Sequence, residues 1–278
     1  MSTFLKIYND LFAYGKPCAP RGEEIKELEN YQATFAPYER LSSFRARNLN
    51  LGYCKQEFLW YLRGDRYDTS IEEHAKMWQK LRDVDGGFNS NYGQYLFKTD
   101  EPRRGGSQLE WVVDELTRDP HSRRACMVLL SPSHLRENNV DVVCTYAISF
   151  RVRDFKLNMS VSMRSNDAIF GLTNDVFCFS MIHEMVFELL RYDWINTPED
   201  NVLHYLGRTL ELGTYTHKVD SLHVYQRHYD MLRALVSEGV DGYEHIEVPR
   251  GDARQFAALL TGGVLNSFDA PLINWLTQ

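Results

Sequence analysis

A cysteine in a strand-like apolar run is the first residue whose type could do chemistry. Cys144 lies within VVCTYAISF, among β-branched and aromatic residues. A thiolate is a good nucleophile for reversible addition, whereas a cysteine in such a run is most often a small buried side chain. The immediate neighbours of Cys144 leave both interpretations open.

Three arginines stand at junctions between loops and expected strands. Arg123 and Arg124 precede the strand-like segment 125–130, and Arg164 ends the polar face of the segment 157–164. Guanidinium groups bind phosphate through paired hydrogen bonds, although adjacent arginines also occur on solvated edges. At the end of a strand, Arg164 needs a partner, and an anion or a thiolate would serve.

Glu57 is a carboxylate among aromatic residues. It lies in QEFLWYL, on the side of a helical pattern that is expected to be buried. Burial raises the pKa of a carboxyl group, which suits acid–base work near neutral pH. A glutamate at the rim of the helix, in contact with water, is the other interpretation.

The elements that must position these residues alternate between helical and strand-like patterns. Apolar residues at helical spacing predict helices at 4–12, 54–62, 71–81, 108–116, 175–190 and after 227. Strand-like runs cover 125–130, 142–152, 157–164, 210–219 and 222–225. Ser70 with Glu73, and Ser107 with Glu110, fit capping boxes. Helices around a mixed sheet give an α+β architecture, and we expect one domain over 1–278.

The composition limits the classes of function. The 278 residues carry a net charge of -7, which disfavours a broad electrostatic grip on nucleic acid. The five cysteines are odd in number and lack the spacing of zinc ligands, so we expect no metal site. They suit a reduced, cytoplasmic protein, and we expect neither a signal peptide nor a membrane span.

Six segments, in this order along the chain, carry a resemblance to a known family. They are QEFLWYLRGD (56–65), NSNYG (89–93), DPHSRR (119–124), VCT (143–145), MRSNDAIFGLTND (163–175) and SLHVYQRH (221–228). The chain resembles the thymidylate synthase family from Arg21 to about Arg227, and most closely its deoxycytidylate hydroxymethylase branch. The resemblance implies a mixed sheet layered with helices and a homodimer that forms through the sheet.

The resemblance also implies a role for each matching residue. Cys144 would be the nucleophile that adds to C6 of the pyrimidine, beside Arg164. Glu57 and Tyr92 match the proton-handling pair of the family. The folate contacts would be Trp78 and Asp167. The remaining matches are substrate contacts: Arg21, Arg164, Ser165 and, from the neighbouring subunit, Arg123 and Arg124 for the phosphate; His223 and Tyr225 for the sugar 3′-hydroxyl; and Asn166 within the same motif.

The implied reaction has a physical basis. C5 of a pyrimidine becomes nucleophilic only after a group has added to C6, and a thiolate beside a guanidinium can add reversibly. C5 would then take a one-carbon unit from the co-substrate 5,10-methylenetetrahydrofolate, and loss of the C5 proton would leave an exocyclic methylene group. Glu57, working through water, is the expected proton acceptor.

Asp175 indicates which base is bound. Thymidylate synthases carry asparagine at the matching position, and its amide complements O4 and N3–H of uracil. A carboxylate only accepts hydrogen bonds, so it complements the 4-amino group of cytosine. A site built for one pattern can reject the other by as much as ~10⁴–10⁵. A capping aspartate before a helix also fits Asp175 locally, but the surrounding motif favours base recognition.

The resemblance therefore favours hydroxymethylation of dCMP, in which water adds to the methylene group and tetrahydrofolate is released. Such a product serves phages whose DNA carries modified cytosine. Departures from the synthases around base and folate fall at Asn50, Leu81, Thr145, Thr173 and Asn174. Three alternatives stay open: hydride transfer that gives 5-methyl-dCMP and dihydrofolate, hydroxymethylation of CMP, and a non-catalytic nucleotide-binding or RNA-binding dimer. The intact candidate residues argue against the last.

Overall fold

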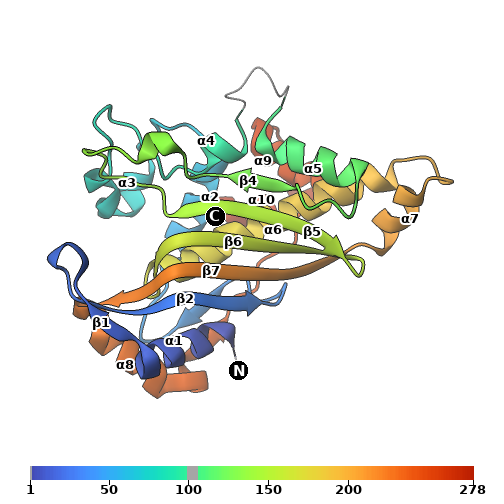
Figure 1. Cartoon of the computed structure of the whole chain (residues 1–278). Coiled ribbons are helices and arrows are strands. Elements are labelled where there is room, and N and C mark those ends of the chain that lie inside the picture. The colour runs from blue at the N-terminus through green and yellow to red at the C-terminus, as the bar shows by residue number, and fades with distance from the viewer. Residues whose placement is uncertain (1, 99–105) are drawn as a thin grey trace.

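Helices pack on a mixed sheet, as the sequence predicts (Figure 1). The computed structural model describes residues 2–98 and 106–278. The helices are α1 (Thr3–Tyr14), α2 (Leu51–Arg63), α3 (Ile71–His74), α4 (Gly93–Leu96), α5 (Gln108–Arg118), α6 (Gly171–Ile195), α7 (Val202–Thr209), α8 (Tyr229–Glu238), α9 (Ala253–Thr261) and α10 (Pro271–Thr277). The strands are β1 (Lys16–Cys18), β2 (Ile25–Phe35), β3 (Ser42–Phe44), β4 (Cys126–Val128), β5 (Thr145–Arg153), β6 (Lys156–Asp167), β7 (Glu211–Tyr225) and β8 (Tyr243–His245).

The direction of three central strands creates the edge that matters for function. In the described part of the chain the larger sheet has six strands, in the order β1-β2-β7-β6-β5-β4. β7 runs parallel to β6, so the chain must cross over between them, and α6 with α7 forms that crossover. The carboxyl ends of β6 and β7 therefore lie at the same edge. Because β5 is antiparallel to β6, the start of β5 lies at this edge too.

The alternation along β6 explains how the sheet is covered. Leu157, Met159, Val161 and Met163 are buried on one face, and polar residues alternate with them. This buried face packs against α6, a helix that is apolar nearly all round because it lies between the sheet and further helices. No helix within residues 2–98 or 106–278 is both long and apolar enough to cross a lipid bilayer.

The backbone geometry shows a tight hairpin turn and confirms one of the predicted capping boxes. The tight turn between β5 and β6 places Asp154 and Phe155 at φ 51° and 58°, the positive values that a short hairpin turn requires. At the start of α5, the Ser107 side chain accepts from the backbone of Glu110 while the Glu110 side chain accepts from the backbone of Ser107. This reciprocal pair is the predicted capping box.

The predicted helix over 71–81 is wrong. α3 ends at His74, Ala75 is extended, and a 3-10 turn follows over Lys76–Lys80. The Ser70 hydroxyl makes no cap because it accepts a hydrogen bond from Arg63 instead. Packing of the Trp78 ring on other aromatic rings then outweighs the local helical pattern. The two strands predicted over 210–219 and 222–225 form one continuous strand, β7.

Candidate active site

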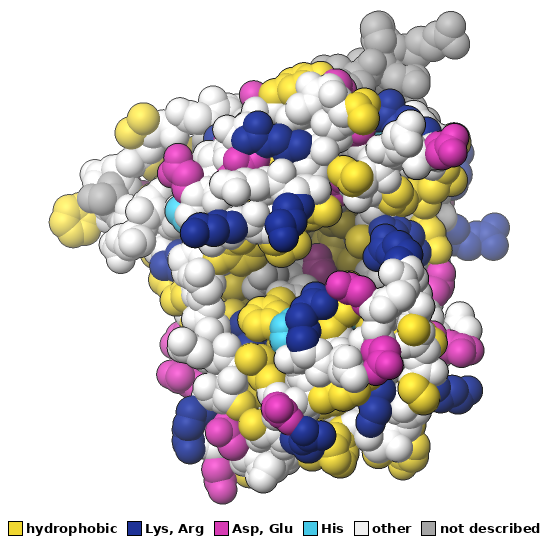
Figure 2. All heavy atoms as spheres, turned by 90° about the vertical axis from the view of Figure 1, so that its left-hand side faces the viewer, with side chains coloured by type: hydrophobic (Ala, Val, Ile, Leu, Met, Phe, Trp, Pro, Cys, Tyr) yellow, Lys and Arg dark blue, Asp and Glu magenta, His cyan; other side chains and the backbone are white. Residues whose placement is uncertain are grey.

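The candidate residues from distant segments meet at the edge where β6 and β7 end and β5 begins. Figure 2 looks onto this end of the molecule and shows a hollow at its centre. Lys and Arg side chains lie around the hollow, and an acidic side chain lies within it. Such a surface suits a small anionic ligand with a polar base, because cations gather at the rim and acceptors lie inside.

Cys144 lies directly before β5, and Arg164 on β6 holds its neighbourhood in place. The Arg164 backbone N–H donates to the Cys144 carbonyl oxygen at 2.8 Å. Its Nε donates to the Val143 oxygen at 3.1 Å, and its Nη2 lies 2.5 Å from the Val142 oxygen and 3.4 Å from Cys144 Sγ. The guanidinium is therefore fixed against the thiol by the chain that carries the thiol.

The Cys144 thiol is under opposing influences. Burial raises its pKa most strongly, and the positive charge of Arg164 opposes that rise. The carboxyls of Asp175 and Asp141 raise the pKa further, whereas Arg21 lowers it. The net direction is upward, so the thiol form is favoured before a ligand binds. Nucleophilic attack from this state needs a proton acceptor or a closer cation.

Asp175 and Asn166 form a polar pair that connects the start of α6 to the end of β6. Asn166 Nδ2 donates to Asp175 Oδ2 at 2.5 Å. Burial raises the pKa of Asp175 to about 7, the Asn166 bond lowers it, and Asp167 raises it. Asn166 Oδ1 is buried and has no hydrogen-bond partner among the described residues. The pair therefore offers a carboxyl group that can gain or lose a proton near neutral pH and an amide oxygen that is free to accept a hydrogen bond.

Glu57 lies on the buried face of α2, as predicted, and is only 7% exposed. Burial raises its pKa to about 8, the Asp175 charge adds to the rise, and a hydrogen bond from Tyr53 opposes it. Tyr53 Oη donates to Glu57 Oε1 at 2.8 Å, and Trp78 Nε1 donates to Tyr53 Oη at 3.0 Å. Glu57 is thus a protonatable group near neutral pH, which suits general acid–base work.

Tyr92 reaches the same region from the loop before α4. It is buried, its ring stacks on Tyr61, and its hydroxyl accepts a hydrogen bond from Thr145 Oγ1 at 3.2 Å. Burial raises the pKa of Tyr92 well above its ordinary value, and the charges of Cys144 and Asp175 add to the rise. Because Thr145 supplies the donor, the hydroxyl proton of Tyr92 is available to a ligand.

The ends of β6 and β7 bring the predicted sugar and phosphate contacts together. Ser165 pairs with Ser221, and Asp167 with His223. The His223 ring packs edge-on against Tyr225, with the ring centroids 5.0 Å apart. The Asp167 carboxylate accepts from the backbone of Ile169 at 3.0 Å, which turns the chain toward α6.

Arg21 lies in the connection between β1 and β2, which projects beside this edge (Figure 1). Its backbone has φ 55°, a left-handed conformation that is uncommon for a non-glycine residue. The side chain is exposed. Burial raises the pKa of both Cys144 and Tyr225, and the charge of Arg21 opposes that rise, so it acts on the site from the rim.

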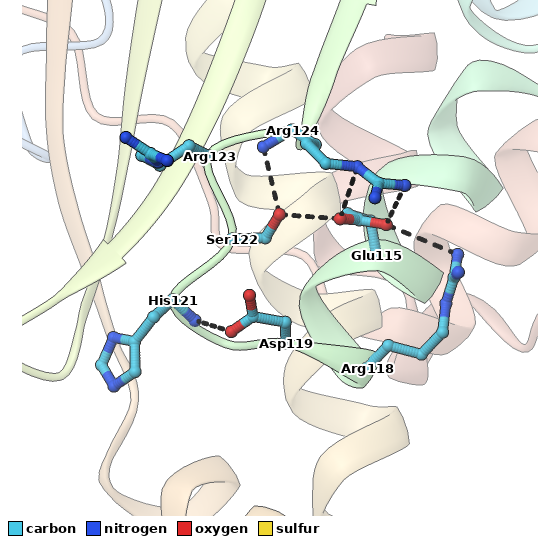
Figure 3. A pocket seen from close by; sticks show the side chains of 7 residues that line it. All are labelled: Glu115, Arg118, Asp119, His121, Ser122, Arg123 and Arg124. Atoms are coloured by element: carbon cyan, nitrogen blue, oxygen red, sulfur yellow. Dashed lines mark hydrogen bonds and ion pairs between the residues drawn. The ribbon is translucent and has the colours of Figure 1, made fainter.

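Arg123 and Arg124 do not join this group. They line a separate cavity of about 380 Å³ at the junction of α5 and β4, with Arg124 Nε 3.2 Å from Glu115 Oε1 (Figure 3). Cys126 pairs with Ser149, so Arg124 lies level with residue 151, seven residues along β5 from Cys144. At ~3.3 Å per residue the separation is about 20 Å. One chain therefore cannot bring these arginines to a ligand held at Cys144.

Sequence analysis missed Tyr53. Its position four residues before Glu57 places both side chains on one face of α2, and that spacing could have drawn attention to it. The long-range contact with Trp78 has no local signal. Asn50 caps α2, since its Oδ1 accepts from the Tyr53 backbone at 3.0 Å.

Comparison with known proteins identifies the family of this chain. The thymidylate synthase family model matches residues 2–197. The deoxycytidylate 5-hydroxymethyltransferase of Enterobacteria phage T4 is 30% identical over 215 residues, which cover 74% of this chain and 78% of that protein. The deoxyuridylate hydroxymethyltransferase of Bacillus phage SP01 is 28% identical over 236 residues, 81% of this chain and 57% of that protein.

A thymidylate synthase is also similar. The enzyme of Bacillus licheniformis is 26% identical over 195 residues, which cover 69% of this chain and 61% of that protein. The match of the family model to well over half of the residues, together with the phage relatives, is consistent with the mixed sheet and its helices. This chain belongs to the thymidylate synthase family.

Proposed function

We propose that this chain hydroxymethylates C5 of dCMP, using 5,10-methylenetetrahydrofolate as the one-carbon donor and water as the final nucleophile. The family supports the coarser part of this reaction, one-carbon transfer to a pyrimidine nucleotide. The hydroxymethyltransferases among the similar proteins support the finer part.

The observation that carries the choice of cytosine is the half-buried Asp175. Its pKa of about 7 means that one proton is readily gained or lost near neutral pH. A proton shared between Asp175 and N3 of cytosine would leave the other carboxyl oxygen to accept from the 4-amino group. Uracil already carries the N3 proton and presents an acceptor at O4, so it would fit only a neutral Asp175 in the opposite orientation. Asn166, bonded to Oδ2, restrains that orientation.

The nucleophile would be Cys144 and its activating cation Arg164. The thiol would give its proton to water in the site as the sulfur adds to C6, with Arg164 Nη2 at 3.4 Å stabilising the developing thiolate. The phosphate of the nucleotide would lie near Arg21, Arg164 and Ser165. With Arg123 and Arg124 of the partner subunit included, four arginines would surround one phosphate.

Proton transfer at C5 would belong to Glu57 and Tyr92. Glu57 Oε2 is buried and has no hydrogen-bond partner among the described residues, so it is free to hold water or take a proton. The folate would supply an electrophilic one-carbon unit. Trp78, packed on Trp60 with centroids 5.0 Å apart, offers an aromatic wall beside Glu57 that suits a pterin ring.

The active form would be a homodimer that pairs through the uncovered face of the sheet. The helices that cover β5, β6 and β7 lie behind the sheet in Figure 1, and the near face carries small polar residues such as Ser162 on β6 and Thr214 and Thr216 on β7. A partner pairing across this face would carry Arg123 and Arg124 to the neighbouring site. That arrangement accounts for arginines that lie about 20 Å from Cys144 in their own chain.

The test is mass spectrometry of dCMP incubated with the protein and methylenetetrahydrofolate, with dihydrofolate absorbance followed in the same tube. Hydroxymethylated dCMP without dihydrofolate is expected. A methylated product with an equal amount of dihydrofolate would mean that hydride, and not water, is added in the last step. If dCMP stays unchanged, CMP and dUMP are tried next, and failure of all three contradicts the proposed reaction.

A further inference from the structure

The side chain of Glu57 is held by a chain of two hydrogen bonds that begins at Trp78. Tyr53 and Glu57 are one helical turn apart on α2, and Tyr53 Oη lies 2.8 Å from Glu57 Oε1. Trp78, from the 3-10 turn after α3, brings its Nε1 to 3.0 Å from the same Tyr53 oxygen. The hydroxyl of Tyr53 therefore lies between an indole nitrogen and a carboxyl group.

The donor chemistry of the indole fixes the direction of the first bond, and the structure gives Tyr53 as the donor in the second. An indole N–H can only donate, so Tyr53 Oη must accept from Trp78. The single hydroxyl proton of Tyr53 is then given to Glu57 Oε1. As long as Tyr53 donates to it, Oε1 is an acceptor, and a proton that Glu57 takes up then resides on Oε2.

The second carboxyl oxygen of Glu57, Oε2, is the unpaired one in the described part of the chain. It is buried and makes no hydrogen bond within residues 2–98 and 106–278. A buried polar atom without a partner is costly, so it points to a group that is present only when the site is occupied. Asp175 faces the same carboxyl from α6.

We propose that Tyr53 is a positioning residue that keeps the exchangeable proton of Glu57 on Oε2, the oxygen that would serve C5 of the pyrimidine. This inference rests on the proposed function for its substrate, but the hydrogen bonds that carry it do not. Without Tyr53, either oxygen of Glu57 could hold the proton, and half of the orientations would be unproductive.

The electrostatic setting of Glu57 gives the proposal a second readout. The titratable groups that face its carboxyl are Tyr53, Cys54 and Tyr61 from α2, and Asp175 and Cys178 from α6. Burial raises the pKa of Glu57 to about 8, and the bond from Tyr53 lowers it. Removing that bond should therefore raise the pKa of Glu57 further.

The test compares Tyr53→Phe with the unchanged protein and with Tyr31→Phe. Tyr31 Oη donates to Asp10 Oδ2 at 2.6 Å, so this control loses the same kind of bond away from the site. The pKa of Glu57 is measured by carbon-13 NMR of glutamate-labelled protein without nucleotide, with Glu57→Gln identifying the signal. It should rise in Tyr53→Phe and stay constant in Tyr31→Phe.

The catalytic readout is exchange of the C5 hydrogen of dCMP with solvent deuterium. Tyr53→Phe should slow this exchange and kcat about tenfold, part of the ~10²–10⁴-fold that placed acid–base groups supply, with KM for dCMP nearly unchanged. An unaltered pKa overturns the hydrogen-bond assignment. A raised pKa with unaltered exchange overturns the positioning role. Failure of the unchanged protein to exchange C5 with dCMP, CMP or dUMP would instead contradict the proposed function, a result that the NMR measurement distinguishes because it needs no nucleotide.

Discussion

Two groups of polar and charged residues lie near the two ends of β5. They differ in whether their side chains have hydrogen-bond or ion-pair partners. At the start of the strand, Glu57 Oε2 and Asn166 Oδ1 are buried and unpaired among the described residues. At the far end, Arg123 and Arg124 are exposed, and Arg124 already pairs with Glu115 (Figure 3). Unpaired polar atoms are costly in the interior and cheap in water.

This difference in pairing suggests two roles. The start of β5 is the candidate reaction site, whereas the far end would supply groups to a site in another subunit. The start of β5 gathers a thiol, the buried carboxyl group of Glu57, the half-buried carboxyl group of Asp175 and a fixed guanidinium, the groups that addition and proton transfer would need. The far end has cations and one buried acid, Glu115, but that acid is already paired with Arg124, and no cysteine lines its cavity in the described part of the chain. If the proposed function is correct, the first group does chemistry and the second binds a phosphate that belongs to another subunit.

Replacing the nucleophile is the largest change that the comparison predicts. Cys144→Ser should lower kcat by about 10³-fold or more, in the range seen when an enzyme loses its nucleophile. Binding of dCMP, measured by calorimetry, should persist because Arg164 and Asp175 remain. Cys126→Ser is the matched control on the neighbouring strand and should be near normal. Ordinary turnover by Cys144→Ser would remove this thiol from the reaction.

Changing the base-reading acid is expected to have the next largest effect. In Asp175→Asn the amide can donate to O4 of uracil and accept from its N3–H, so the ratio of kcat/KM for dCMP to that for dUMP should fall by about 10³-fold. Asp193→Asn alters an exposed acid at the other end of α6 and should leave the ratio as it was. An unchanged ratio in Asp175→Asn would mean that the base is recognised elsewhere.

Mixing two impaired variants, at a dCMP concentration that saturates only intact sites, tests whether the two ends of β5 work across subunits. Arg123→Ala with Arg124→Ala in one chain should weaken dCMP binding about 10²-fold, as expected for two charged groups at about 1.5 kcal/mol each. Combined with Cys144→Ser subunits, half of the dimers would be mixed, and each would hold one intact site, so about a quarter of normal activity should return. The unmixed variants are the controls. No recovery after proven subunit exchange would contradict shared sites.

The sequence was enough to predict the parts of the site that depend on local pattern. The polar and apolar alternation of β6 and the aromatic helix around Glu57 gave the sheet face and the buried acid, and both are observed. The capping box at Ser107 was equally local. These features depend on residues within one or two turns of each other, where spacing alone determines which side chains share a face.

Contacts between distant segments could not be predicted in this way. The helix predicted over 71–81 breaks at Ala75, and the break lets Trp78 reach Tyr53. The distance between Arg124 and Cys144 follows from the register of β4 on β5, which no local pattern encodes. Local sequence patterns do not show which residues of neighbouring strands pair, or where tertiary packing overrides a helical pattern.

The smallest expected effect concerns the stability cost of the buried acids. The pKa of Glu57 is raised to about 8 in the folded chain, so between its ordinary value of 4.5 and 8 the folded state binds more protons than the unfolded state. Stability should therefore fall as pH rises through this window, by as much as about 1.4 kcal/mol per pH unit for each such group.

Glu57→Gln should flatten this decline in the free energy of unfolding, measured by urea unfolding between pH 5.5 and 8. Asp10→Asn is the opposite control: burial raises the pKa of Asp10, but the bonds from Lys6 and Tyr31 outweigh it and hold it below its ordinary value of 3.8. Its contribution to stability is therefore constant between pH 5.5 and 8 and is lost only in more acidic solution, so Asp10→Asn should leave the slope in that window unchanged. Equal slopes for Glu57→Gln and the unchanged protein would mean that Glu57 is ionised in the fold, and that the start of β5 holds no more strain than its far end.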